Sequence, residues 1–398
     1  MPPETPFSHD GAPARTVFPR IAGLADIRGA LDCNRGRRLF TQGSFLVVRT
    51  TSALSTTYTD ALHLEMRGLV FARDGERLLS RTLHKFFNLH ERESLQDLEF
   101  RGGVRLETKI DGSMIGAFVH AGAVHFHTRG GFQKQAAQAR AHAPEGALAL
   151  VRDADAHGLT PVFEWTHPDT RIVIAHARPE LTLLGVRDRL TGRYDDQKAD
   201  ALAHAHAIAR PQQLARHLAS PDEVSSALTD LRARTDIEGG VLVFPDGHRI
   251  KVKTDDYLYR HKILDQMSNE RHAYRVCLDD AVDDVATALG GARGRALTRF
   301  AHDLDAALMR AGDRLEHASR DLAAIPGRDR ASIMQNRFSP LERKVVFAGL
   351  KTGDFTGAVR ELLDKRVAHA GHREEIKTAF GLPNWRLDDI DLYGRHTT

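Results

Sequence analysis

Hydrophobic residues between positions 44 and 253 come in short runs that are separated by turn residues. Residues 69–71 (Leu-Val-Phe) and 78–79 (Leu-Leu) flank an Asp74-Gly75 pair. Aspartate followed by glycine favours the tight turn that joins two antiparallel strands. This segment therefore predicts a β-hairpin.

A second hairpin is predicted near residue 245, where residues 241–244 meet the turn sequence Pro245-Asp246-Gly247. After this turn, Ile250 and Val252 alternate with Lys251 and Lys253. Side chains alternate between the two faces of a strand, so both lysines should project from one face, about 7 Å apart.

Helical patterns lie between these strands, at residues 135–142 and 144–152 and from Pro221 onward. The last begins with Ser-Pro-Asp-Glu at residues 220–223, which has the form of a capping box. The first two thirds of the chain therefore read as an α+β domain with antiparallel sheets.

Beyond residue 259 the pattern becomes helical, because residues 297–322 carry Phe300, Leu304, Leu308 and Leu315 at helical spacing. Further helices are predicted at residues 341–350 and 358–368. We expect a flexible N-terminal arm (1–20), a catalytic domain (21–260) and an all-α C-terminal domain (261–398).

Composition narrows the class of protein. With 41% hydrophobic and 27% charged residues and no apolar run near 18 residues, the chain should have no membrane span. Only Cys33 and Cys277 are present, too few for a disulfide framework or a thiolate zinc cluster, so we expect a reducing cytoplasm. A net charge of +3 does not by itself indicate a nucleic-acid binder.

The sequence Lys109-Ile110-Asp111-Gly112 is the first candidate for chemistry. It lies between two strand-like segments, so Lys109 should sit at a tight turn. Alone the signal is weak, because Asp-Gly is an ordinary turn sequence. No Gly-Lys pair occurs in the chain, which excludes the P-loop as the means of binding ATP.

Five further segments supply groups that phosphoryl transfer to a lysine requires. They are Glu65-Met66-Arg67-Gly68, Lys85-Phe86-Phe87-Asn88, Phe163-Glu164-Trp165, Glu238-Gly239-Gly240-Val241 and Lys251-Val252-Lys253. In this order, and with Arg171-Ile172-Val173-Ile174-Ala175 after the glutamate, the set resembles the bacteriophage RNA ligase 1 family of covalent nucleotidyltransferases.

The resemblance implies a role for each matching residue. Lys109 would be the nucleophile that accepts AMP, on a turn shaped by Asp111 and Gly112, while Lys251 and Lys253 contact the α-phosphate. The ATP-binding residues implied are Arg67, Lys85, Phe87, Arg129, Glu164, Glu238 and Gly239, of which Glu164 meets a ribose hydroxyl and Glu238 helps to hold metal.

For two of these residues, the role that the resemblance implies is less certain to apply. Phe87 would lie beside adenine, where stacking is reasonable, or it could be an ordinary core phenylalanine. Arg129 stands where relatives often have lysine, and a guanidinium keeps the charge while changing its geometry.

A lysine attacks phosphorus only as a free amine, and nearby cations together with partial burial lower the pKa of an ammonium group. We expect Arg67, Lys85, Lys251 and Lys253 to act on Lys109 in this way. The same cations, with Mg²⁺ or Mn²⁺, would stabilise the charge on the transferring phosphate.

The reaction that the resemblance implies is ATP-dependent RNA ligation, which joins a 5'-phosphate to a 3'-hydroxyl through lysyl-AMP and an adenylylated RNA end. Repair of tRNA and RNA recognition by the helical domain are the implied context. DNA ligases and capping enzymes usually place a β-barrel after the last lysine motif, whereas this region reads as helical. They remain alternatives, as does a noncatalytic protein that binds RNA ends.

Overall fold

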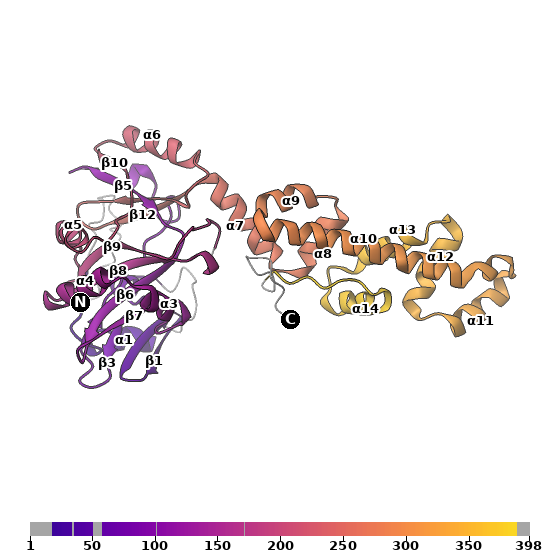
Figure 1. The fold of residues 1–398 in the computed structure, drawn as a ribbon, viewed down its shortest axis with the longest axis horizontal. Helices are drawn as coiled ribbons and strands as arrows, with labels where there is room; N and C mark the ends of the chain where they lie inside the picture. The colour runs from indigo at the N-terminus through magenta and orange to yellow at the C-terminus, as the bar shows by residue number, and fades with distance from the viewer. Residues whose placement is uncertain (1–17, 34–35, 51–57, 101, 171, 388–398) are drawn as a thin grey trace. The chain divides into compact units, whose positions relative to one another are not determined.

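The structure is a computed structural model that describes residues 18–33, 36–50, 58–100, 102–170 and 172–387. Most of the expected N-terminal arm lies outside these residues, as does Arg171. The chain divides into two compact units, residues 1–258 and 259–398. Unit 1 combines antiparallel sheets with helices, and unit 2 is helical in its described part, which confirms the predicted α+β class (Figure 1).

The first sheet of unit 1 has the strand order β1-β2-β3-β4, with every neighbouring pair antiparallel. Its predicted hairpin forms, because β3 pairs with β4 around Gly75, whose φ of +68° suits glycine. Two short helices pack against the sheet through a buried apolar cluster. The bounds are α1 Ala25–Cys33, β1 Arg37–Gln42, β2 Phe45–Thr50, α2 Ala61–Glu65, β3 Val70–Ala72 and β4 Leu78–Ser80.

The second sheet has the order β7-β6-β8-β9 and is also antiparallel. Three helices cover it through small buried residues such as Ala139 and Ala154. The bounds are β6 Ser113–His120, β7 Ala123–His127, α3 Lys134–His142, α4 Glu145–Ala156, β8 Leu159–Thr166, β9 Glu180–Asp188 and α5 Asp196–Ala205.

The third sheet has the order β10-β5-β11-β12. Its second predicted hairpin is confirmed: β11 and β12 pair, Ile250 and Val252 enter the core under α6, and Lys251 and Lys253 stay on the other face. The bounds are β5 Val104–Lys109, β10 Gln213–Leu218, α6 Pro221–Arg232, β11 Gly239–Val243 and β12 Arg249–Lys253, with one-turn 3-10 helices η2 Leu95–Asp97 and η3 Pro168–Thr170.

The start of α6 realises only half of the predicted capping box. The Ser220 hydroxyl accepts the Glu223 amide, as expected. The Glu223 carboxylate, however, accepts the amide of Ala219 rather than that of Ser220. The helix still begins where the pattern placed it.

Unit 2 is built around the long helix α10, whose residues Phe300, Leu304, Leu308 and Leu315 are buried as their spacing predicted. Gly353 ends α12 with φ +78°, a backbone conformation that glycine adopts readily. The bounds are α7 Asp255–Met267, which begins in unit 1, α8 Glu270–Leu278, α9 Val282–Leu289, α10 Gly291–Ser319, η4 Arg320–Ala324, α11 Gly327–Arg337, α12 Pro340–Thr352, α13 Phe355–Arg366 and α14 Ala370–Phe380.

Two of the described residues at the end of the expected arm, Phe18 and Pro19, contact other parts of unit 1. The Phe18 ring lies edge-on to Tyr194, with ring centres 5.7 Å apart, and the Pro19 carbonyl accepts a hydrogen bond from Arg81 at 2.9 Å. None of the described helices is long and apolar enough to cross a membrane.

Candidate nucleotide-binding and catalytic site

Lys109 lies where the chain passes from one sheet to another. It is the last residue of β5 in the third sheet, and β6 of the second sheet begins at Ser113. Because β5 and β6 belong to different sheets, the Ile110-Asp111-Gly112 link is not the turn of a hairpin. The lysine therefore lies at the point where the chain leaves the third sheet and enters the second.

Asp111 fixes this link through a buried carboxylate that accepts three hydrogen bonds. One oxygen accepts the amides of Val173 and Ile174, each at 2.8 Å, and the other accepts the hydroxyl of Tyr257 at 2.9 Å. The neighbouring backbone carbonyl of Asp111 bonds to His176 at 2.8 Å. Two separate segments, residues 173–176 and the start of α7, thus hold the residue two positions after Lys109.

Gly112 is required by the close approach of β8. A Cβ at this position would lie 2.5 Å from the carbonyl oxygen of Trp165 and 3.1 Å from the Cγ of Glu164. Real Cβ atoms do not come so close to backbone oxygens, so any side chain here would push β8 away from the turn.

Strand register places Lys109 and Lys253 on either side of Gly239. In the third sheet Gly239 pairs with Lys109 of β5 and with Lys253 of β12. Paired residues of neighbouring strands project from the same face, and glycine leaves the space between the two lysines empty. A Cβ on Gly239 would also lie 2.1 Å from the Val252 carbonyl oxygen, so glycine is required here as well.

Glu238 joins the two lysines. One carboxylate oxygen lies 2.6 Å from the Lys109 ammonium nitrogen and the other lies 3.3 Å from that of Lys253. The side chain of Glu238 is 5% exposed, so both ion pairs are shielded from water. The Lys253 ammonium also lies 4.7 Å from the centre of the Tyr257 ring.

The same face of the sheet carries two further rows of paired residues. Val241 pairs with Glu107 and Lys251, and Val243 pairs with Arg105 and Arg249. β12 therefore presents one cation in each row. With increasing distance from Lys109, these cations are Lys253, Lys251 and Arg249.

The pKa of Lys109 is raised, which contradicts the expectation that nearby cations lower it. Burial disfavours the ammonium, but Glu238 and Glu164 outweigh this effect and stabilise the charged form. The prediction was wrong because it considered only the cations near Lys109, whereas the carboxylates of Glu238 and Glu164 also lie near its ammonium group. Lys109 is therefore held as a charged group that is paired with Glu238.

Lys251 is the lysine whose pKa is lowered. Burial and the neighbouring cations Lys85 and Arg67 bring it to about 7. Lys251 can therefore gain a proton at neutral pH when a phosphate comes near, since an anion favours the ammonium form. Such a group suits a phosphate-binding position.

Glu164 lies on β8, where it pairs with Met114 of β6. Burial raises the pKa of its carboxyl to about 7, although Lys109 and Arg67 act in the opposite direction. A carboxyl that is partly protonated at neutral pH can either donate or accept a hydrogen bond.

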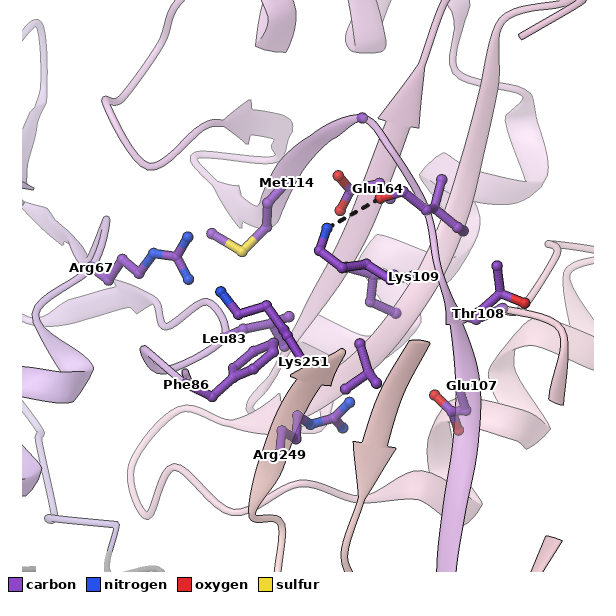
Figure 2. Close-up of a pocket in the computed structure, with 15 residues that line it drawn as sticks. Arg67, Leu83, Phe86, Glu107, Thr108, Lys109, Met114, Glu164, Arg249 and Lys251 are labelled. Atoms are coloured by element: carbon purple, nitrogen blue, oxygen red, sulfur yellow. Dashed lines mark hydrogen bonds between the residues drawn. The ribbon is translucent and has the colours of Figure 1, made fainter. Parts of the chain in front are cut away.

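A pocket opens beside Lys109 and collects most of these groups (Figure 2). Its polar side chains are those of Arg67, Glu107, Thr108, Lys109, Glu164, Arg249 and Lys251, with Arg67 on one side of Lys251 and Lys109 on the other. Its apolar walls are Leu83, Phe86, Met114, Leu184, Pro211 and Val241.

Phe86 lines this pocket and Phe87 does not, so the structure does not bring the predicted stacking residue to it. The Phe87 ring is covered instead by Arg92, at 3.9 Å, and Lys85, at 4.8 Å. Strand-like alternation explains the difference, since neighbouring residues of an extended segment face opposite sides.

Arg67, Lys85 and Arg129 form a group of cations near the outer end of the pocket. Burial and then Arg129 lower the pKa of Arg67, whose Nε has no hydrogen-bond partner among the described residues. Burial and then Arg67 lower the pKa of Lys85. Arg129 is exposed, and its backbone packs against Gly68, next to Arg67. The three charges repel one another, as expected for a site that receives an anion.

A family model described as RNA ligase matches residues 65–267, a little over half of the chain and every predicted site residue. The chain belongs to this RNA ligase family. The resemblance inferred from the motifs is thereby confirmed.

Individual members of the RNA ligase family match over a shorter region. A putative RNA ligase of Thermovibrio ammonificans is 33% identical over 36% of this chain and 39% of its own length. RNA ligase 1 of bacteriophage TS2126 is 26% identical over 33% of this chain and 36% of its own. The chain thus matches well under two thirds of either relative. Among solved structures, an archaeal ATP-dependent RNA ligase has a TM-score of 0.46 at 16% identity, covering 61% of this chain and 64% of its own.

The motifs did not point to several residues that the structure places at this candidate site. Phe86, Glu107 and Arg249 line the pocket, and Tyr257 holds Asp111. The alternation that grouped Lys251 with Lys253 could have found Arg249, and the same rule links Glu107 to Lys109. No pattern points to Tyr257, because it comes from the first turn of α7.

The described residues contain no group of three or more histidine, cysteine, aspartate or glutamate side chains that could hold a metal ion alone. Glu238 and Glu164 supply oxygen atoms, which Mg²⁺ and Mn²⁺ prefer. Mg²⁺ is often held by one or two carboxylates together with substrate phosphates, and this site fits that arrangement.

Proposed function

We propose that this protein is an ATP-dependent RNA ligase that carries AMP covalently on Lys109. The observation that supports this most directly is the row formed by Lys109, Gly239 and Lys253, with Glu238 bonded to both lysines at the edge of a pocket. A lysine so placed beside a pocket that Arg67, Lys251 and Arg249 also line suits attack on the phosphate of a bound nucleotide.

In the first step the Lys109 nitrogen attacks the α-phosphorus of ATP, a nitrogen–phosphorus bond forms and the bond to pyrophosphate breaks. Lys109 must first lose a proton, and the Glu238 carboxylate at 2.6 Å is placed to accept it. The ion pair that raises the pKa of Lys109 is also the path by which the proton leaves.

Lys251 and Lys253 of β12, together with the group around Arg67, would hold the phosphates. Lys251 gains charge as the anion binds, and the unpartnered Nε of Arg67 offers a donor. Glu238 and Glu164 would hold Mg²⁺ or Mn²⁺, which would neutralise phosphate charge when bound.

In the later steps AMP passes from Lys109 to the 5'-phosphate of an RNA, and a 3'-hydroxyl then displaces AMP to form the phosphodiester. Repair of cleaved tRNA is the context we propose, with the helical unit 2 contributing to RNA recognition and the reaction taking place in the cytoplasm. Support for these proposals comes from the family and the helical character of unit 2.

The test is a joining assay with Mg²⁺, ATP and an RNA that ends in a 5'-phosphate and a 3'-hydroxyl. Wild-type protein should convert it to the sealed product, and Lys109→Ala should not. The same variant should seal an RNA that already carries 5'-linked AMP, because only the first step needs the amine.

The control arms separate the alternatives. Sealing of DNA but not RNA would identify a DNA ligase, and protein labelling by GTP in place of ATP would indicate a capping-type enzyme. If the protein binds RNA ends but neither joins them nor becomes labelled, the result would support a noncatalytic protein that binds RNA ends.

A further inference from the structure

The inner end of the pocket contains a buried guanidinium that the phosphate chemistry does not use. Arg249 is 4% exposed and lines the pocket. Its side chain projects from the same face of β12 as Lys251 and lies on the side of Lys251 away from Lys109 (Figure 2).

Arg249 is held in place but incompletely bonded. Its guanidinium carbon lies 4.3 Å from the centre of the Tyr194 ring, and its Nη2 lies 3.8 Å from Asp196. Asp196 is engaged more closely by Arg105, at 2.6 Å. The Nε of Arg249 is buried and has no hydrogen-bond partner among the described residues.

A buried charged donor without a partner destabilises a folded protein, so its presence in a pocket points to a ligand acceptor. Tyr194 is itself fixed, because its hydroxyl bonds to His84 at 2.8 Å and a second guanidinium, that of Arg187, lies 4.6 Å from its ring. The ring therefore offers a rigid support that keeps Arg249 at the end of the pocket.

The order of groups along β12 indicates which part of a nucleotide reaches Arg249. Lys253 and Lys251 lie toward Lys109, where the α-phosphate must sit, and Arg249 lies one alternate position further, about 7 Å beyond Lys251. Phe86, Leu184 and Val241 line the pocket, as does Glu107, which pairs with Val241 on the side opposite Lys251. Apolar walls that end in a polar group suit a planar base better than a ribose or a phosphate.

We propose that Arg249 recognises the nucleobase, donating a hydrogen bond to an acceptor nitrogen of the purine ring. This inference rests on the proposed function, since it takes the ligand to be the ATP that reacts with Lys109. A guanidinium only donates hydrogen bonds, so the partner must be one of the unprotonated nitrogens N1, N3 or N7.

The test replaces each of these nitrogens by carbon. Unlabelled 1-deaza-, 3-deaza- and 7-deaza-ATP compete with α-labelled ATP for labelling of wild-type protein, of Arg249→Met and of the control Arg152→Met, an exposed arginine of α4. Loss of a hydrogen bond from a charged donor should make one analogue about tenfold or more weaker than ATP on wild type and on the control. On Arg249→Met that analogue should compete as well as ATP, and ATP itself should bind about tenfold more weakly.

The inference is overturned if all three analogues compete with wild type as well as ATP does. It is also overturned if Arg249→Met still discriminates against the same analogue, because another group then reads that nitrogen. If Arg249→Met does not fold, Arg249→Leu, which also lacks a donor, takes its place, and undiminished discrimination by it contradicts the proposal. Absence of any ATP label on wild-type protein would instead refute the proposed function, so the two failures are distinct.

Discussion

The ammonium nitrogen of Lys109 lies 2.6 Å from a carboxylate oxygen of Glu238. This pair affects the charge of the proposed nucleophile, because the carboxylate favours the ammonium over the reactive amine. The ion pair therefore favours the form of Lys109 that cannot attack phosphorus.

Glu238→Gln should move the pH profile of lysyl-AMP formation. The neutral amide no longer stabilises the ammonium, so the pKa of Lys109 falls and the rise in rate with pH begins about one unit lower or more. The maximal rate should also fall, since a proton acceptor is lost. Single-turnover labelling at saturating ATP between pH 6 and 10 measures both effects.

Glu145→Gln is the matched control, because this exposed carboxylate contacts Arg152 on α4, away from Lys109. It should keep the wild-type profile. If the labelling rates of wild type and Glu238→Gln rise over the same pH range, Glu238 does not determine the pKa of Lys109.

Lys251→Met should weaken ATP binding and stabilise the protein. The folded-state pKa of about 7 lies below the ordinary value of lysine, so the charged form destabilises the fold. This penalty is complete below pH 7 and shrinks as pH rises toward the unfolded-state pKa. The unfolding temperature of Lys251→Met should therefore exceed that of wild type most at pH 6 and least at pH 10.

Proton uptake provides a second readout for Lys251. At pH 7.5 its side chain is largely neutral, and binding of the triphosphate should charge it. Calorimetry in buffers of different ionisation enthalpy should show more protons taken up per ATP by wild type than by Lys251→Met. Equal uptake by both proteins would contradict the assigned pKa.

Gly239→Ala should abolish labelling and lower stability by about 1 to 3 kcal/mol, because the new Cβ overlaps the Val252 carbonyl and forces β11 away from β12. Gly29→Ala is the control, since a Cβ there, on the helix α1, meets no atom within 4 Å. It should leave labelling intact and stabilise the protein by about 0.5 to 1 kcal/mol. Urea unfolding and labelling measure the two properties, and a fully active Gly239→Ala would disprove the crowding argument.

The sequence predicts those parts of the site whose residues lie close together in the chain, and it does not predict contacts between residues far apart in the chain. Strand alternation placed Lys251 and Lys253 on one face, because that relationship is local to β12. The approach of Glu238 to Lys109 depends on β5 and β11 becoming neighbours across more than a hundred residues. No local pattern contains that pairing, so the direction of the Lys109 pKa shift was predicted wrongly.

Asp111→Asn tests the anchor of the Lys109 turn. Three donors point at the Asp111 carboxylate, and an amide NH₂ would face one of them as a second donor. We expect a loss of about 1 to 3 kcal/mol in the free energy of unfolding and a slower first step. Tyr257→Phe removes only one donor, so it should reduce the free energy of unfolding and the rate of the first step less than Asp111→Asn does. A larger effect of Tyr257→Phe would show that the tyrosine does more than hold Asp111.

The most direct test of the account is the mass of the intact protein after incubation with ATP and Mg²⁺, followed by peptide mapping. The account predicts one added AMP, linked to the Lys109 peptide, stable to denaturation and absent from Lys109→Ala. Unmodified wild-type protein, or AMP on a different residue, would contradict it.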